Sequence, residues 1–235
     1  MKINKIVLDS VNSTNKYCKD NIDKLSSFDI VIANEQTSGY GRFNRNWHQE
    51  KGNSIALSLV YKSNVNLAEV GRFSIVTSVS ILNVLLKYID NVAVKWPNDI
   101  LINDKKVCGI LVETLNCDGL TNLIIGVGLN VNNTDFKNDL SNIATSLFIE
   151  TKKMTNIDLI TDEIILEMFN NITNISQNYS SLHQKYIDYS VVLGRKIQFK
   201  GKCYKIINIL ENGHIQGIGA NNEIINISSG EISLS

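Results

Sequence analysis

A short polar run near the middle of the chain holds the residues best suited to chemistry. It contains Lys95, Asn98 and Asp99, and a second lysine follows at Lys106. A carboxylate can hold magnesium, and a lysine can neutralise the charge that builds up when a carboxylate attacks a phosphate. The run therefore suits the activation of a carboxylic acid by ATP. The alternative is a surface hairpin with ordinary salt bridges, and these residues alone favour neither.

The neighbouring sequence predicts a hairpin that would position these groups. Proline lacks an amide donor, so Pro97 must mark a bulge or a strand end. The pattern predicts strands at residues 92–94, 100–102 and 107–115, with a turn at Asn103-Asp104. Asp99 and Lys106 would then lie on the two arms of one hairpin.

An irregular segment at residues 35–52 is a second candidate. It has no hydrophobic period, and it contains several glycines, Arg42, Arg45 and Trp47. Mobile backbone amides and guanidinium groups bind phosphate oxygens, and a tryptophan can cover an apolar or purine face. The segment lacks the Walker and dinucleotide-binding patterns. It is therefore either a ligand-binding lid or a solvated loop with exposed arginines.

Two glycines in an apolar strand mark a third candidate. Gly126 and Gly128 interrupt the run at residues 123–130, and the period of a strand places both on one face. Their missing side chains would let a ligand or another backbone come close. Close packing of the sheet explains these glycines equally well.

The remaining pattern predicts an α+β fold with a mixed β-sheet packed against helices. Further strands are predicted at 6–8, 29–34 and 54–61, and helices from Ser13 toward Leu25, over 70–85 and over 158–189. The tail changes to short strands, at 197–200, 204–209, 215–218 and 224–227. Its Asn212-Gly213 pair favours a hairpin, so the tail predicts a small β-barrel. We expect two domains, residues 1–189 and 190–235.

Composition argues against several classes of protein. The 23 lysines and arginines balance 23 aspartates and glutamates, so no general affinity for nucleic acid or an anionic membrane is expected. Scattered cysteines and histidines indicate neither a zinc site nor a disulfide framework. The apolar stretch at 73–86 is shorter than the roughly 20 residues of a membrane span, which predicts a core helix. The N-terminus has no secretory signal, so we expect a cytoplasmic protein.

These segments, in this order, resemble the catalytic part of biotin protein ligases, the enzymes that attach biotin to a carrier domain of biotin-dependent carboxylases. The resemblance covers essentially the whole chain. It rests on Ser13-Thr14-Asn15, residues 36–47, Lys95 to Asp99, Lys106 to Glu113, Gly126-x-Gly128-x-Asn130 and the terminal residues 230–234.

The resemblance implies an ATP-dependent biotin–[acetyl-CoA-carboxylase] ligase with a biotin/lipoate ligase-like catalytic domain and an SH3-like barrel. With ATP and Mg2+, such an enzyme converts biotin to biotinyl-5'-AMP. It then transfers biotin to a lysine of the biotin carboxyl carrier protein or domain of acetyl-CoA carboxylase or another biotin-dependent carboxylase. Because the chain begins almost directly at Ser13-Thr14-Asn15, we expect no winged-helix domain and no DNA binding. Whether two copies form a homodimer stays open, since an exposed sheet edge could also pair with the carrier.

The resemblance also implies roles for individual residues. Catalysis is assigned to Lys106, Arg42 and Asp99, with magnesium near Asp99. Substrate contacts are assigned to Ser13, Thr14, Asn15, Gln36, Gly39, Gly41, Arg42, Trp47, Lys95, Asn98, Lys106, Gly109, Gly126, Gly128 and Asn130. A helix cap is the competing role at residues 13–15, which would meet the biotin ring. A core tryptophan is the competing role at Trp47, which would cover the nucleotide side.

The loop departs from the pattern of that family. Family loops usually read Gly-Arg-Gly-Arg-Arg-Gly-Arg, whereas this chain has Tyr40, Phe43 and Asn44 at the second, fifth and sixth places. Fewer cations should weaken phosphate attraction and a lost glycine should stiffen the loop, so its ordering on ligand binding stays open. Two other functions also stay open: a lipoate ligase or transferase of related fold, and a non-catalytic biotin-sensing protein.

Overall fold

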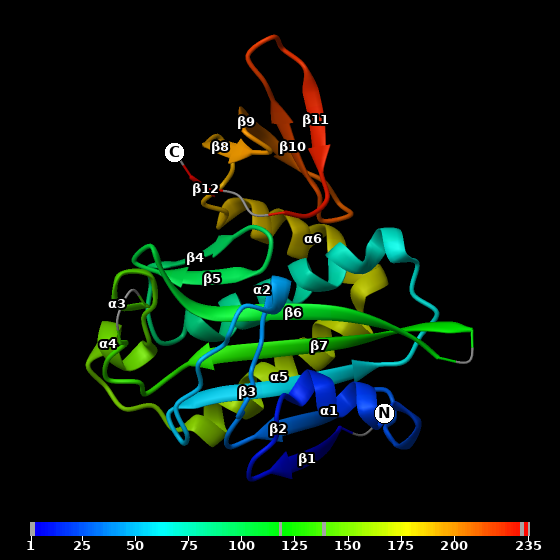
Figure 1. Cartoon of the computed structure of the whole chain (residues 1–235), viewed down its shortest axis with the longest axis vertical. Helices are drawn as coiled ribbons and strands as arrows, with labels where there is room; N and C mark the ends of the chain where they lie inside the picture. Colours follow the sequence, from blue (N-terminus) through cyan, green and yellow to red (C-terminus); the bar gives the residue numbers. More distant parts are fainter. Residues whose placement is uncertain (1–2, 118, 138–139, 231–232, 235) are drawn as a thin grey trace.

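The computed structural model describes residues 3–117, 119–137, 140–230 and 233–234. Its main body is a seven-stranded sheet in the order β1-β2-β3-β7-β6-β5-β4 (Figure 1). The strands are β1 (Asn4–Leu8), β2 (Asp29–Ala33), β3 (Ser54–Tyr61), β4 (Val92–Lys95), β5 (Asp99–Ile102), β6 (Lys105–Cys117) and β7 (Leu120–Asn130). β1 and β2 run parallel and the other neighbouring pairs run antiparallel, so the predicted mixed sheet is confirmed.

The predicted hairpin is also confirmed. β5 and β6 pair antiparallel around Asn103 and Asp104, whose φ angles are 49° and 65°. Short polar side chains such as these tolerate positive φ, which a tight hairpin turn requires. Pro97 lies in the turn between β4 and β5, outside the paired residues, because it has no amide hydrogen for a ladder.

Helices cover both faces of the sheet (Figure 1). α2 (Val70–Leu85), α5 (Ile157–Thr173) and α6 (Ile175–Asp188) pack on one face and bury the main hydrophobic core. α1 (Thr14–Asp20) and a 3-10 turn at Ile22–Lys24 lie on the other face, over a smaller core. The short helical segments are η2 (Arg42–Asn44), η3 (Leu67–Glu69), α3 (Leu140–Ile143) and α4 (Leu147–Thr151).

Two predicted helices differ from the structure. The sequence predicted one continuous helix over residues 158–189, whereas in the structure Asn174 separates α5 from α6. The Asn174 side-chain amide donates to the carbonyl of Asn170 at 2.9 Å, and such local bonds compete with continuation of a helix. The first predicted helix, drawn toward Leu25, likewise ends early, where Asn21 donates to the carbonyl of Tyr17 at 3.0 Å.

The most apolar helical segment lies inside the fold. Residues 67–85 are long and apolar enough to cross a membrane by length and composition alone, with a mean hydropathy of 1.3. Over half of that stretch, 56%, is buried, and α2 packs against β6, α5 and α6. Packing in the core therefore explains its apolar residues, as predicted for residues 73–86.

A second, five-stranded antiparallel sheet follows α6 in the order β11-β10-β9-β8-β12 (Figure 1). Its strands are β8 (Lys196–Phe199), β9 (Lys202–Ile209), β10 (Ile215–Ile218), β11 (Ile224–Ile227) and β12 (Ser233–Leu234). The predicted strands of the tail and its Asn212-Gly213 turn are confirmed, and Gly213 has the positive φ of 84° that favours glycine. Glu231 and Ile232 of the terminal motif lie outside the described residues.

The turn of the C-terminal sheet presses against the main body. The indole nitrogen of Trp96 donates to the carbonyl of Gly213 at 2.8 Å. A Cβ atom on Gly71, in α2, would lie 2.3 Å from the carbonyl oxygen of Asn212. Side chains such as Ile206 join the same hydrophobic core as α2. The two sheets thus share one core, and the predicted domain boundary after residue 189 stays a prediction.

We expect Gly71→Ala to destabilise the protein, because the new methyl group would overlap the carbonyl oxygen of Asn212. Overpacking of this kind costs about 1–3 kcal/mol, which urea unfolding would measure. Ala68→Ser, at an exposed position of the preceding turn, is the control and should stay within about 0.5 kcal/mol of the wild type. Unfolding of Gly71→Ala at the same urea concentration as the wild type would show that Gly71 and Asn212 are not in close contact.

Candidate active site

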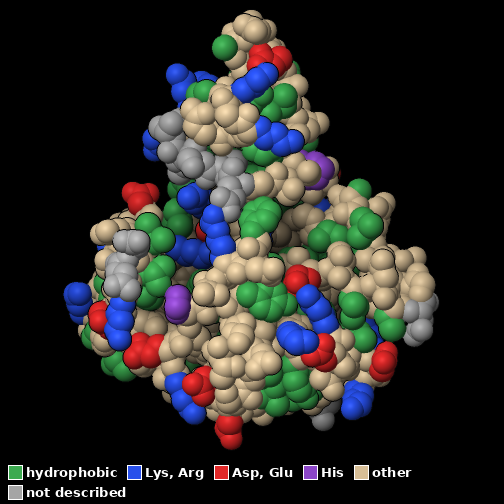
Figure 2. Space-filling model, viewed as in Figure 1, with side chains coloured by type: hydrophobic (Ala, Val, Ile, Leu, Met, Phe, Trp, Pro, Cys, Tyr) green, Lys and Arg blue, Asp and Glu red, His purple; other side chains and the backbone are tan. Residues whose placement is uncertain are grey.

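A cavity of about 620 Å³ lies where the loop at residues 35–52 crosses the front of β3, β7 and β6 (Figure 1). Lysine and arginine side chains gather on this face, between the two sheets (Figure 2). The lining includes these predicted residues: Ser13, Thr14, Asn15, Gln36, Gly41, Arg42, Trp47, Lys95, Asn98, Asp99, Lys106, Gly109, Gly126, Gly128 and Asn130. Gly39 is the exception, since it is buried behind the lining, where a Cβ would come within 2.8 Å of the carbonyl oxygen of Trp47.

The β5–β6 hairpin brings Lys106 and Asp99 into an ion pair. Lys106 Nζ lies 2.6 Å from Asp99 Oδ1, and the two side chains are 34% and 24% exposed. Lys95 lies opposite Asp99 in the β4–β5 ladder. Partial burial strengthens the attraction between an ammonium group and an anion compared with open water. The cavity wall therefore holds a cation that an incoming anion can share with Asp99.

Arg42 joins the loop to the turn between β4 and β5. Its guanidinium group donates to Asn98 Oδ1 at 3.5 Å and to the carbonyl of Gly230 at 3.4 Å. The Asn98 amide nitrogen donates to the carbonyl of Ile110 at 2.8 Å, which fixes its oxygen toward Arg42. Because these two bonds are long, a phosphate can replace them with the shorter, paired bonds that a guanidinium group forms with an anion.

Three glycines leave a bare patch on the β6–β7 ladder. Gly109 and Gly128 are direct partners in that ladder. A Cβ on Gly128 would lie 2.4 Å from Cε2 of Trp47, and a Cβ on Gly126 would lie 2.3 Å from Oδ1 of Asn15. The alternatives from the sequence were the approach of a ligand or backbone and simple sheet packing. In the structure, three side chains of the chain itself lie against the patch, namely Trp47, Asn15 and, at Gly109, Lys106.

A buried chain of hydrogen bonds closes one end of the cavity. Gln36 Oε1 accepts from the backbone nitrogen of Thr14 at 2.8 Å. The Ser58 hydroxyl lies 2.7 Å from Thr14 Oγ1 and 2.6 Å from Asn15 Oδ1. Ser13 occupies the N-cap position of α1, but its side chain makes no capping bond, so the helix-cap role does not explain its hydroxyl.

Part of the wall comes from a segment that sequence reasoning missed. Phe136, Leu140, Asn142, Ile143 and Ala144 also line the cavity. The segment is held in place because the amide of Thr145 donates to the carbonyl of Lys106 at 2.9 Å, and Asn130 Nδ2 donates to the carbonyl of Thr145 at 3.0 Å. Asn130, predicted as a polar wall, therefore also anchors the chain that follows β7. Apolar side chains in an otherwise polar stretch were the available signal.

Cys108 lies beside the ion pair on β6 but is unsuited to nucleophilic catalysis. Its side chain is completely buried. Burial raises the pKa of its thiol well above the usual range, and the nearby Lys106 offsets this only in part. The thiol therefore stays protonated at neutral pH. No cysteine lies in the cavity lining among the described residues.

The polar wall fits magnesium that is held together with a nucleotide. In the described part of the chain, no three His, Cys, Asp or Glu side chains are close enough to hold a metal ion. Magnesium is commonly bound through one or two carboxylates and the phosphates of a substrate. Asp99 and Asp104 line the cavity together with the amide of Asn98. These oxygen donors fit the predicted magnesium position near Asp99.

Comparison with known proteins gives a consistent picture. The profile of the Biotin/lipoate A/B protein ligase family matches residues 7–130. The Bifunctional ligase/repressor BirA of Bacillus subtilis (strain 168) is 38% identical over 122 residues, which are 50% of this chain and 38% of that protein. The Biotin--[acetyl-CoA-carboxylase] ligase of Paracoccus denitrificans is 32% identical over 129 residues, 53% of either protein. The chain thus spans about two fifths to a half of these relatives.

A solved structure extends the likeness to the whole fold. The biotin protein ligase from Aquifex aeolicus in complex with biotin and ATP matches with a TM-score of 0.84 and 26% identity. The match covers 99% of this chain and 98% of that one. It confirms the predicted combination of a mixed sheet, covering helices and a small C-terminal β-domain.

We expect Gly128→Ala to displace the indole of Trp47, because the new methyl group would overlap the ring. The released indole should be quenched more strongly by acrylamide, while the buried Trp96 gives a constant background. Gly41→Ala is the control, since a Cβ there would meet a carbonyl oxygen at 3.9 Å, an ordinary contact. Equal quenching in Gly128→Ala and the wild type would show that Trp47 does not rest on the sheet.

Proposed function

The chain belongs to the biotin/lipoate A/B protein ligase family, and from this premise we propose that it is an ATP-dependent biotin protein ligase. It activates biotin with ATP to give biotinyl-5'-AMP and then transfers biotin to a lysine of a carrier protein. The observation that carries the proposal is the Lys106–Asp99 ion pair in the wall of a cavity that also contains Arg42. The relative from Aquifex aeolicus with biotin and ATP bound supports both substrates.

In the first step, the carboxylate of biotin attacks the α-phosphate of ATP, and pyrophosphate leaves. Two anions must approach each other, and Lys106 and Arg42 offset their repulsion where the charge builds up. The cavity holds both reactants in contact, which replaces a chance encounter by positioning. Magnesium, bound with the nucleotide near Asp99 and Asn98, would neutralise further phosphate charge.

In the second step, the lysine amine of the carrier attacks the carbonyl carbon of biotinyl-5'-AMP. An amide forms and AMP leaves, so the chain itself need not form a covalent intermediate. The protonated thiol of Cys108 agrees with this sequence of steps.

The roles proposed for the other predicted residues follow from the part of the site to which each belongs. Four parts of the site are distinguished: the end that would hold the biotin ring (the ring end: Ser13, Thr14, Asn15 and Gln36), the loop (Gly39, Gly41 and Trp47), the wall near the phosphates (Lys95 and Asn98), and the floor with the far wall (Gly109, Gly126, Gly128 and Asn130).

The proposed partner is the biotin carboxyl carrier protein or domain of acetyl-CoA carboxylase. Relatives from Paracoccus denitrificans and Mycobacterium tuberculosis are named as ligases of that carboxylase, which supports this choice. We propose that the reaction takes place in the cytoplasm.

The direct test is a streptavidin blot of an acetyl-CoA carboxylase carrier domain incubated with the protein, ATP, magnesium and biotin. We expect labelling that requires ATP and disappears when the acceptor lysine of the carrier is changed to arginine. An excess of lipoate should leave the labelling intact. Transfer of lipoate in place of biotin would instead indicate a lipoate ligase. Binding of biotin without any transfer would indicate a biotin-sensing protein.

We expect Lys106→Ala to lower biotin-dependent exchange of pyrophosphate into ATP by about a hundredfold to a thousandfold, since one preorganised charge in the reacting centre is worth that much. Lys87→Ala is the control, because Lys87 pairs with Glu163 and neither residue lines the cavity. Full exchange activity in Lys106→Ala would remove this lysine from the mechanism.

A further inference from the structure

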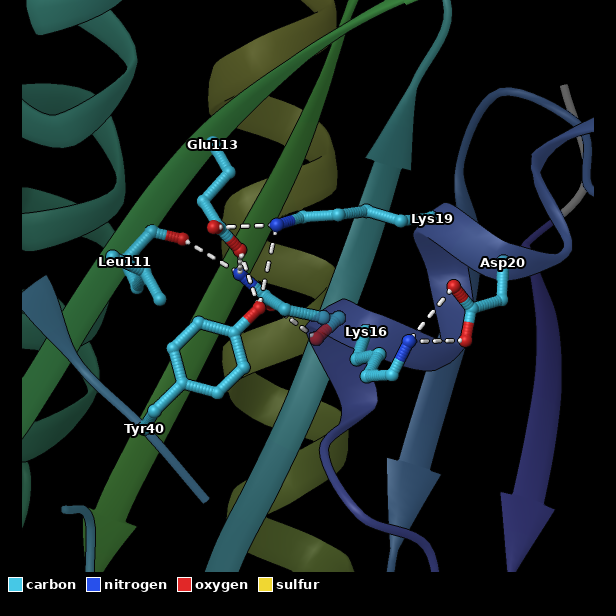
Figure 3. Close-up of polar contacts among 8 residues, drawn as sticks. Lys16, Lys19, Asp20, Tyr40, Leu111 and Glu113 are labelled. Atoms are coloured by element: carbon cyan, nitrogen blue, oxygen red, sulfur yellow. Dashed lines mark hydrogen bonds and ion pairs between the residues drawn. The ribbon is translucent and has the colours of Figure 1, made fainter. Parts of the chain in front are cut away.

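Three side chains beside the cavity form a cluster that the reaction above does not use (Figure 3). Lys19 Nζ lies 2.6 Å from Glu113 Oε1 and 3.3 Å from the hydroxyl of Tyr40. That hydroxyl donates to Glu113 Oε2 at 3.1 Å. Because Lys19 belongs to α1, Tyr40 to the loop and Glu113 to β6, the cluster ties three separate segments together. We name these three residues the loop clamp.

The loop clamp is partly shielded from solvent. The side chains of Lys19 and Glu113 are 30% and 22% exposed. Burial raises the pKa of Tyr40 and the nearby Glu113 raises it further, so its hydroxyl stays protonated and able to donate. A second ion pair on the same helix, Lys16 with Asp20, is 54% and 55% exposed and stays within α1 (Figure 3). Of these two lysines of α1, Lys19 is therefore the one that contacts the loop and the sheet.

On the loop side, the clamp holds a small folded unit. Tyr40 pairs with Asn46 in an isolated antiparallel bridge. Around it, the amide of Gly41 donates to the carbonyl of Arg45 at 2.8 Å, and the amide of Trp47 donates to the carbonyl of Gly39 at 2.9 Å. Because these bonds connect both ends of the segment, fixing Tyr40 also fixes the backbone that carries Arg42 and Trp47.

On the sheet side, the clamp reaches the ring end of the cavity. Asn15 Nδ2 donates to Glu113 Oε2 at 2.8 Å and to the carbonyl of Leu111 at 3.3 Å. Both hydrogens of this amide are therefore used. Its oxygen must then point the other way, where it accepts from Ser58 at 2.6 Å above the bare position of Gly126. The carboxylate of Glu113 thus decides which end of the Asn15 amide faces the cavity.

We propose that Tyr40 is a positioning residue that acts through Glu113, fixing the Asn15 amide and holding the loop against the sheet before any ligand binds. The inference takes the identity of the ligand from the proposed function, whereas the state of the loop without ligand is independent of it. A loop that is already folded loses less conformational freedom on binding, so the apparent affinity rises with the fraction of molecules in the binding-competent form. Tyr40, which departs from the usual loop sequence, thus orders the loop through contacts within the protein.

The test compares Tyr40→Phe and Lys19→Met with Lys16→Met and the wild type. In the absence of ligand, trypsin cleavage after Arg42 and Arg45, followed by mass spectrometry, reports how often the loop opens. We expect cleavage to be about threefold to tenfold faster in the two clamp variants, since each loses one partner of a bond to a charged group. Lys16→Met should be cleaved like the wild type because its ion pair touches neither the loop nor the sheet.

Steady-state kinetics give the second measurement. We expect KM for biotin to rise by up to about threefold in Tyr40→Phe, with a much smaller change in kcat. The factor is smaller than for cleavage, because KM varies inversely with the fraction of molecules in the competent form, whereas cleavage varies with the fraction that is open. Equal cleavage rates in all four proteins would overturn the proposal, as would a loss of kcat at constant KM. If either clamp variant fails to fold, Glu113→Gln, which keeps the side-chain shape, takes its place in both measurements. A wild type that transfers no biotin would refute the proposed function, while the cleavage rates would still decide the role of the clamp.

Discussion

The site depends on three missing side chains in the β6–β7 ladder. Gly109, Gly126 and Gly128 let Trp47 and Asn15 lie directly on the sheet. The space is so narrow that a Cβ atom at Gly126 or Gly128 would overlap these side chains. The loop can then cross the ladder near the Lys106–Asp99 pair, and the start of α1 can reach Ser58 in β3. Side chains at these positions would lift both segments away, so the cavity would lose one wall and its closed end.

The cations depend on supports from distant parts of the chain. In the turn between β4 and β5, the indole nitrogen of Trp96 donates to the C-terminal sheet at Gly213, and Asn98 is fixed by its bond to the carbonyl of Ile110. Arg42 bridges this turn to Gly230 beside the last strand. Both sheets therefore contribute to one electrostatic wall, which agrees with the hydrophobic core that they share. A reaction between two anions needs such fixed positive charge more than it needs a nucleophile.

Local chemistry explains which features the sequence predicted well. A lone proline, an Asn-Asp turn and alternating apolar residues have meanings that neighbouring residues alone determine, so the hairpin and most strands were predicted correctly. The side chains that lie against the glycine patch could not be predicted in this way, since Trp47 is about eighty residues distant in sequence from Gly128. The roles of Glu113 and Ser58, and the wall formed by Phe136, Leu140 and residues 142–144, were missed for the same reason. Their roles arise from contacts between segments, and none of them carries a periodic pattern.

In the proposed reaction, one cavity holds the acid at the Asn15 end and the phosphate at Lys106. A crystal structure with a non-hydrolysable analogue of biotinyl-5'-AMP tests it most directly. We expect the ring of the analogue to lie beside Asn15 and above Gly126, with its phosphate in contact with both Lys106 and Arg42. An analogue bound elsewhere, or bound here with its phosphate away from Lys106, would show that the cavity does not hold the two reactants in this way.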